Sequence, residues 1–282
     1  MSDITSANGI CQDINAYAVT TGVSPFHTNA KSLLATSLNT DLPLAFQNIE
    51  RWQDQKVVSP YASGFAAEAL FERDHGSSAI ELIERVWGIM ADETNPNYSG
   101  GHWEAMKPDG TLVHDDTSLM HGWSTWPVYL LPRYLGGLQP LEPGWTRWKC
   151  KPILAGLSNV QVQISTPTGE IKASVEIDES LGTGNISLTV PTGTVAEFSA
   201  PEGWVIATDA SPKTQAFTGP QETLTVEIKR TGQSLTQSQG SIGEKAPVSV
   251  EEVEKLPPVT EATPKEPGIS RLAAFIRRVL SC

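Results

Sequence analysis

The sequence predicts an α+β chain of several domains, in which a helical domain is followed by a small antiparallel β-sandwich. Two observations support this prediction. Apolar residues recur at helical spacing in the first half of the chain, and they alternate with polar residues between 158 and 230. Strands that follow the helices, instead of alternating with them, favour domains of different class over one α/β sheet. We place the domains at 1–150 and 151–230, with a tail at 231–282.

Helical hairpins are expected in the first domain. In "SSAIELIERVWGIM" the apolar residues recur every three or four positions, and Ser78 and Glu81 have the spacing of a capping box. The preceding "YASGFAAEALFERDHG" predicts a helix that ends at Gly76, and two helices joined so closely form a hairpin. The stretches "CQDINAYAVTTG" and "NAKSLLATSLNT" predict an earlier pair of helices.

A third helical region is expected in "DDTSLMHGWSTWPVYLLPRYLGG". Asp115 and Asp116 are typical of a helix N-cap. Pro127 predicts that the helix begins or kinks close to it, and the pair Gly136–Gly137 predicts its end.

Short strands are expected in the second domain. "NVQVQISTPTGEIKASVEI" alternates apolar and polar residues on both sides of Gly169, which predicts a hairpin with one buried face. "ISLTVPTGTVAEF" repeats this design around Pro191–Gly193, and "ETLTVEIKR" predicts a further strand. About six such strands indicate a sandwich.

The tail differs from both domains. Residues 231–268 are rich in Ser, Thr, Gln, Pro and Glu, a composition that predicts disorder. "SRLAAFIRRVL" then predicts a short amphipathic helix. This helix could dock on the protein, or it could bind a membrane surface or a partner.

Charge and cysteine usage exclude several classes of protein. A net charge of −12 with scattered Lys and Arg argues against nucleic-acid binding. The sequence contains no run of 18 apolar residues, so no membrane span is predicted. The start of the chain, "MSDITSANGICQDINAY", lacks the features of a signal peptide, so the chain as it stands is expected in the cytoplasm. The three cysteines are expected to be free thiols, and we predict neither a metal nor a cofactor.

The most unusual stretch is the loop at 95–126, which holds three of the five histidines and three of the eight tryptophans. Its candidate site residues are His102, Trp103, Glu104, His121 and Trp123. A flat indole suits the apolar face of a sugar, and a carboxyl group can take part in glycosidic cleavage. Simpler roles remain open: a surface glutamate, a structural histidine, or core packing for Trp123 and Trp126.

The stretches "SPYASGFAAEAL", "GHWEAMKPDGTLVHDDTSLMHGWSTWPVYLLPRYLGGLQPLEPGW" and "VQVQISTPTGEIKASVEI" resemble the C-terminal part of bacterial and fungal α-L-rhamnosidases. The resemblance covers residues 9–228. It implies that residues 1–150 are part of a six-hairpin (α/α)6 barrel, followed by the C-terminal β-sandwich.

The resemblance also implies a function, the inverting hydrolysis of glycosides that carry terminal α-L-rhamnose. It implies that Glu104 is the general base and that His121 contacts the bound sugar, with His102, Trp103 and Trp123 as further substrate-binding candidates. Family members can be secreted, so the resemblance leaves the location unknown.

One departure from the family pattern matters. The family's general acid belongs to an acidic, arginine- and tryptophan-containing motif that precedes this region, and no such motif occurs in the chain. We therefore expect about half of a barrel, with an apolar face that favours self-association. The alternatives to an active enzyme are a non-catalytic truncated remnant or pseudoenzyme, or a subunit that completes its barrel with another chain.

Overall fold

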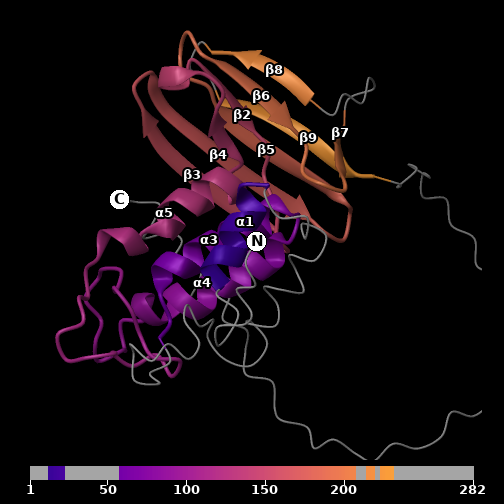
Figure 1. Ribbon diagram of the computed structural model, residues 1–282. Helices are drawn as coiled ribbons and strands as arrows, with labels where there is room; N and C mark the ends of the chain where they lie inside the picture. The colour runs from indigo at the N-terminus through magenta and orange to yellow at the C-terminus, as the bar shows by residue number, and fades with distance from the viewer. Residues whose placement is uncertain (1–11, 23–56, 208–213, 220–222, 232–282) are drawn as a thin grey trace, which may run out of the picture.

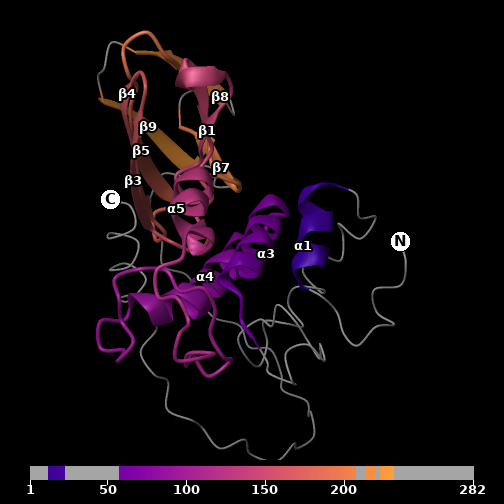
Figure 2. The same cartoon turned by 60° about the vertical axis from the view of Figure 1, so that its left-hand side comes forward.

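The computed structural model describes residues 12–22, 57–207, 214–219 and 223–231, as a group of helices beneath one end of a two-sheet β-sandwich (Figures 1 and 2). The helical segments are α1 (Gln12–Thr20), α3 (Pro60–Glu72), α4 (Gly76–Ala91), η4 (Gly122–Ser124), α5 (Trp126–Leu130), the π-helical turn η5 (Leu131–Leu135) and η6 (Pro143–Trp145). The strands are β1 (Leu138–Pro140), β2 (Arg147–Cys150), β3 (Asn159–Thr166), β4 (Gly169–Asp178), β5 (Thr183–Thr189), β6 (Val195–Ser199), β7 (Trp204–Ile206), β8 (Thr214–Thr218) and β9 (Thr223–Arg230).

The predicted hairpin of α3 and α4 is present, but its turn differs from the prediction. Helix α3 begins after Ser59, whose hydroxyl oxygen accepts a hydrogen bond from the N–H of Ala62 at 3.4 Å. It ends at Glu72, and Gly76 is the first residue of α4, so the predictions of a C-cap at Gly76 and of a capping box were wrong.

Packing explains why a glycine stands at position 76. A Cβ added there would lie 2.6 Å from Cγ2 of Ile153, in the loop that follows β2. The turn itself uses Asp74, which has a φ of 60°. The glycine thus permits close contact between α4 and the sandwich, a constraint that the local sequence pattern does not reveal.

Helix α1 confirms the prediction made for "CQDINAYAVTTG". Its expected partner, "NAKSLLATSLNT", lies outside the described residues, as do the predicted disordered linker and the amphipathic helix of the tail.

The third helical region is shorter than predicted. Residues 115–121 form turns and bends, so Asp115 and Asp116 do not begin a helix. Instead the N–H of His114 donates to the Thr117 hydroxyl at 2.9 Å, a local bond of the kind that competes with helix formation. The predictions for Pro127 and Gly136 are confirmed, because Pro127 lies in the first turn of α5 and Gly136 caps η5.

The sandwich consists of a four-stranded sheet, β1-β2-β6-β8, and a five-stranded sheet, β3-β4-β5-β9-β7. The predicted hairpin of β3 and β4 forms with one buried face, in which Val160 lies opposite Val175 and Val162 lies opposite Ala173, all four buried. The strand pairs are antiparallel except for β2 and β6, which run parallel. Strands β1 and β2 precede residue 151, at which the sequence places the start of the sandwich domain.

The segment around Pro191–Gly193 does not form the predicted hairpin. Strand β5 belongs to the five-stranded sheet and β6 to the four-stranded sheet, so this segment crosses between them. Proline cannot donate to a strand ladder, and Gly193 adopts a φ of 76°. The alternation of apolar and polar residues correctly predicted two strands, but the predicted pairing of these strands with each other was wrong.

One continuous apolar core runs from α1 through both sheets. Cys150 is fully buried in it as a free thiol, and burial raises the pKa of that thiol. Each helix in the described part of the chain is too short or too polar to cross a bilayer.

Candidate functional site

The loop between α4 and η4 is fixed to the start of α3 by a short β-bridge. The N–H of Val58 donates to the carbonyl of Met106 at 2.8 Å, and the N–H of Met106 donates to the carbonyl of Val58 at 3.1 Å. Trp103 of the same loop packs into the apolar core, with 0% of its surface exposed. A ring without exposed surface cannot stack on a sugar, so Trp103 positions the loop from within the core.

Glu104 is held against a second segment of the loop. Its N–H donates to the carbonyl of Ser118 at 2.8 Å, and its carboxylate accepts from the N–H of Ser118 at 3.3 Å. Close by, the N–H of His121 donates to the carbonyl of His102 at 2.7 Å. These bonds place residues 102–104 and 118–121 side by side, so the loop brings Glu104, His102 and His121 into one region.

An exposed aromatic strip begins at His121. The ring centroids of His121 and Trp123 are 4.2 Å apart, and those of Trp123 and Tyr61 are 5.6 Å apart. Trp123 is 48% exposed and Tyr61 is 44% exposed, so both rings present a face to solvent. The alternative of core packing is therefore wrong for Trp123, whereas Trp126 packs against the core beside Phe65.

Tyr61 was missed by the sequence reasoning. It lies in the first turn of α3, and its ring also meets that of Phe65, four residues on, at 5.2 Å. The four-residue spacing of two aromatic rings was a usable signal for a shared helix face. Its partner Trp123, by contrast, comes from a segment 62 residues later in the sequence.

His102 is partly buried, and this burial lowers the pKa of its imidazole. A lowered pKa favours the neutral ring at physiological pH, which has one N–H donor and one nitrogen acceptor. Such a ring can bond to a hydroxyl group in either direction.

The sequence analysis also missed a cluster of two glutamates and two tyrosines on α3 and the α5–η5 segment. The phenol of Tyr134 donates to Glu72 at 3.2 Å and to Glu68 at 3.4 Å, and the phenol of Tyr129 donates to Glu68 at 3.3 Å. Burial, followed by the charge of Glu72, raises the pKa of Glu68. The guanidinium of Arg133 lies over both tyrosine rings.

Within the described ranges, no group of three or more His, Cys, Asp or Glu side chains is arranged to hold a metal ion.

A family model matches a large part of the β-sandwich. Residues 137–205 match the family model of the bacterial alpha-L-rhamnosidase C-terminal domain. A search among curated proteins gave no significant match.

Solved structures of α-L-rhamnosidases share the fold. The enzyme from Dictyoglumus thermophilum superposes with a TM-score of 0.56 at 14% identity, covering 78% of this chain and 26% of that chain. The Streptomyces avermitilis enzyme, solved with L-rhamnose, gives 0.53 at 14% identity over 80% and 23% of the two chains. The Aspergillus terreus enzyme gives 0.52 at 16% identity over 75% and 24%.

The chain thus spans about a quarter of the length of these solved relatives. The family match begins at residue 137, next to β1, includes β1 to β6 and ends at residue 205 within β7. Residues 137–205 therefore match the C-terminal domain of bacterial α-L-rhamnosidases, and the chain shares its fold with part of the solved α-L-rhamnosidases.

Proposed function

We propose that this chain forms one side of the active site of an inverting α-L-rhamnosidase, with Glu104 as the general base. An inverting glycosidase needs one carboxylate to deprotonate the attacking water and one carboxylic acid to protonate the leaving oxygen. The observation that supports this role is the backbone pairing of residues 102–104 with 118–121, which brings Glu104 into the same part of the loop as His121, where the exposed aromatic strip begins.

The remaining site residues would bind the sugar. The exposed face of Trp123 would stack on the apolar side of the rhamnose ring, with His121 at its edge. His102 would contact a sugar hydroxyl. In this proposal the buried Trp103 contributes by positioning Glu104 rather than by touching the substrate.

The helices α1, α3, α4 and α5 would belong to an (α/α)6 barrel, and the general acid would come from outside the described residues. Several exposed apolar side chains lie on these helices, and they would favour self-association: Tyr17, Val128 and Tyr129. Light scattering tests this expectation, and a monodisperse monomer at high concentration would contradict it.

A non-catalytic role is the second candidate. The observation that favours it is that the acidic, arginine- and tryptophan-containing motif of the family does not occur in this sequence. A subsite that lacks its general acid could still bind rhamnose but would cleave ordinary rhamnosides poorly.

The decisive experiment uses a substrate that needs no acid. The leaving group of 2,4-dinitrophenyl α-L-rhamnoside departs without protonation, so its hydrolysis depends on the base alone. We expect the full chain to hydrolyse it with inversion, and to act on 4-nitrophenyl α-L-rhamnoside poorly or not at all. Glu104→Gln should lower the first rate by about 10²- to 10⁴-fold.

A matched control is Glu176→Gln, which alters an exposed glutamate on β4. Hydrolysis that survives E104Q would rule out Glu104 as the base. If neither rhamnoside is cleaved but L-rhamnose still binds, and Trp123→Ala weakens that binding, the non-catalytic role is correct.

A further inference from the structure

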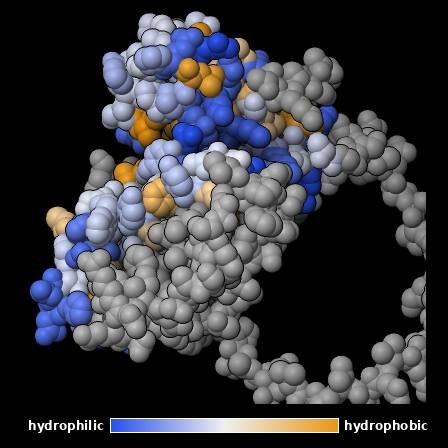
Figure 3. Space-filling view, in the orientation of Figure 1, coloured by the Kyte–Doolittle hydropathy of each residue, from blue (hydrophilic) through white to orange (hydrophobic). Residues whose placement is uncertain are grey.

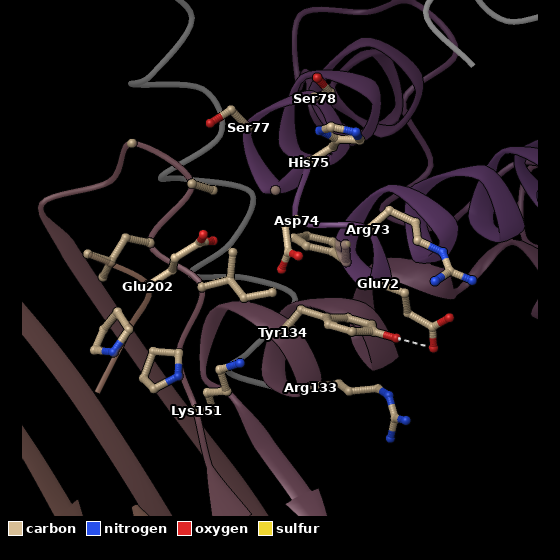
Figure 4. Close-up of a pocket in the computed structure, with 18 of the residues that line it drawn as sticks. Glu72, Arg73, Asp74, His75, Ser77, Ser78, Arg133, Tyr134, Lys151 and Glu202 are labelled. Carbon is tan, nitrogen blue, oxygen red and sulfur yellow. Dashed lines mark hydrogen bonds between the residues drawn. The ribbon is translucent and has the colours of Figure 1, made fainter. Parts of the chain in front are cut away.

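A cleft of about 750 Å³ lies between the α3–α4 turn and the base of the sandwich (Figure 4). It is separate from the loop that carries Glu104, none of whose residues line it. Its volume is within the usual range for small-molecule sites. On the face in Figure 3, hydrophilic residues gather at the lower end of the sandwich, above the helices.

The sandwich wall of the cleft carries two lysines, Lys149 in β2 and Lys151 directly after its end. Trp148 and Cys150 are buried in the core, so the alternating residues Lys149 and Lys151 project outward, and both line the cleft. Their attachment points, two residues apart in extended backbone, are ~7 Å from each other. Within the residues described, neither lysine side chain has a hydrogen bond or an ion pair.

Arg147, the first residue of β2, has an ion-pair partner among the described residues, which these two lysines do not have. Arg147 forms an ion pair with Glu197 on the neighbouring strand β6, and its Nε donates to that carboxylate at 2.7 Å. Lys149 and Lys151 are therefore two adjacent positive charges that form no ion pair with the described residues, since Glu197, which lies opposite Lys149 on β6, is bonded to Arg147. Their mutual repulsion is relieved when an anion binds.

The remaining cleft residues argue for hydroxyl groups on the same ligand. Asp74 comes from the α3–α4 turn and Glu202 from the turn before β7, and neither side chain has a hydrogen bond or an ion pair with the described residues. Carboxylates accept hydrogen bonds from hydroxyls but repel a multiply charged anion such as phosphate. Ser77 adds a hydroxyl to the wall (Figure 4).

The cleft also offers apolar surface. Pro152, Ile153 and Pro201 line it beside the charged groups. The C–H faces of a sugar ring can pack on such side chains while its polar groups reach the rim. Glu72 and Arg133 also line the cleft, but they contact tyrosines: Glu72 accepts a hydrogen bond from Tyr134, and the Arg133 guanidinium lies over the ring of Tyr129. In Figure 4 they lie on the side away from Glu202.

We propose that this cleft binds a carboxylated saccharide, either a uronic acid or an oligosaccharide that contains one. Lys149 and Lys151 bind the carboxylate through charge-assisted hydrogen bonds, and Asp74 and Glu202 accept hydrogen bonds from ring hydroxyls. The inference does not depend on the role proposed for Glu104.

The test is a calorimetric titration of the full chain with glucuronate, glucose and inorganic phosphate at low ionic strength. Glucuronate should bind more tightly than either of the other two probes. The double variant Lys149→Gln/Lys151→Gln should weaken glucuronate binding by about tenfold or more, and added salt should weaken it as well.

Lys172→Gln is the control, because it removes an exposed positive charge from β4, outside the cleft. It should leave glucuronate binding unchanged. Three results would each overturn the proposal: glucuronate that binds no better than glucose, phosphate that binds as tightly as glucuronate, or equal binding by the double variant. Thermal unfolding of each variant verifies that it is folded.

Discussion

Gly64 on α3 packs directly against the indole ring of Trp126 on α5: a Cβ built on Gly64 would overlap the ring atoms. Trp126 also meets Phe65, the next residue of α3, at 4.7 Å between ring centroids. The glycine thus allows α5 to approach α3, and this approach supports the neighbouring η4 turn that carries Trp123.

Gly64→Ala should therefore destabilise the protein although alanine favours helix. The added methyl group forces the ring to move, and overpacking of this kind costs about 1 to 3 kcal/mol. Chemical denaturation with tryptophan fluorescence measures the change.

Gly88 on α4 provides the matched control, because a Cβ there meets nothing within 4 Å. Gly88→Ala should stabilise the protein by about 0.5 to 1 kcal/mol, the difference in helix propensity. If G64A and G88A shift stability in the same direction, the contact with Trp126 is not tight.

The sequence predicted elements whose pattern is local. The β3–β4 hairpin followed from alternation around Gly169, because a single buried face fixes which residues point inward. The crossing at Pro191–Gly193 could not be predicted in this way, since alternation shows that a strand has a buried face but not which sheet it joins.

The sequence was sufficient to predict which loop carries the candidate site, but not which of its aromatic rings are buried or exposed. Glu104 and His121 share one short stretch of sequence, and the structure places their segments side by side. The burial of Trp103 and the exposure of Tyr61 depend on tertiary packing, because neither the loop nor the first turn of a helix has a periodic pattern that separates inside from outside.

The raised pKa of Glu68 predicts a pH-dependent contribution to stability. A carboxyl whose pKa is higher in the folded state binds its proton more tightly there, so its contribution is fully present below its ordinary value of 4.5 and is lost as the pH rises through the folded value. Glu68→Gln should therefore be more stable than the wild type at pH 7, and the difference should shrink toward pH 4.

Urea denaturation at both pH values measures this difference. Glu176→Gln serves as the control, because Glu176 is exposed on β4 and its side chain has no hydrogen bond or ion pair with the described residues. An E68Q variant that is less stable than wild type at pH 7 would mean that the bonds from Tyr129 and Tyr134 outweigh the cost of burying the charge.

The thiol of Cys150 should resist alkylation in the folded protein. It is fully buried, its Sγ lies 3.5 Å from the carbonyl oxygen of Gly136, and burial raises its pKa. Only the thiolate reacts, so iodoacetamide at pH 8 should leave this position unmodified until denaturant is added. Peptide mass spectrometry resolves this cysteine from the other two. Rapid labelling without denaturant would show that the sandwich core opens locally.

The junction between η5 and the sandwich should depend on Gly137. This residue has a φ of 68°, and a Cβ placed on it would overlap the backbone of Lys151, whose N–H donates to the Gly137 carbonyl at 3.0 Å. Gly137→Ala therefore combines conformational strain with a clash against backbone, which cannot rotate away.

Gly144→Ala is the control, because Gly144 has a similar φ of 71° but open space around it. Strain alone costs of order 1 kcal/mol, so G144A should lower the free energy of unfolding by about that amount, and G137A by clearly more. Thermal and urea denaturation compare the two variants, and equal losses would show that the backbone contact at Lys151 adds nothing to the left-handed strain.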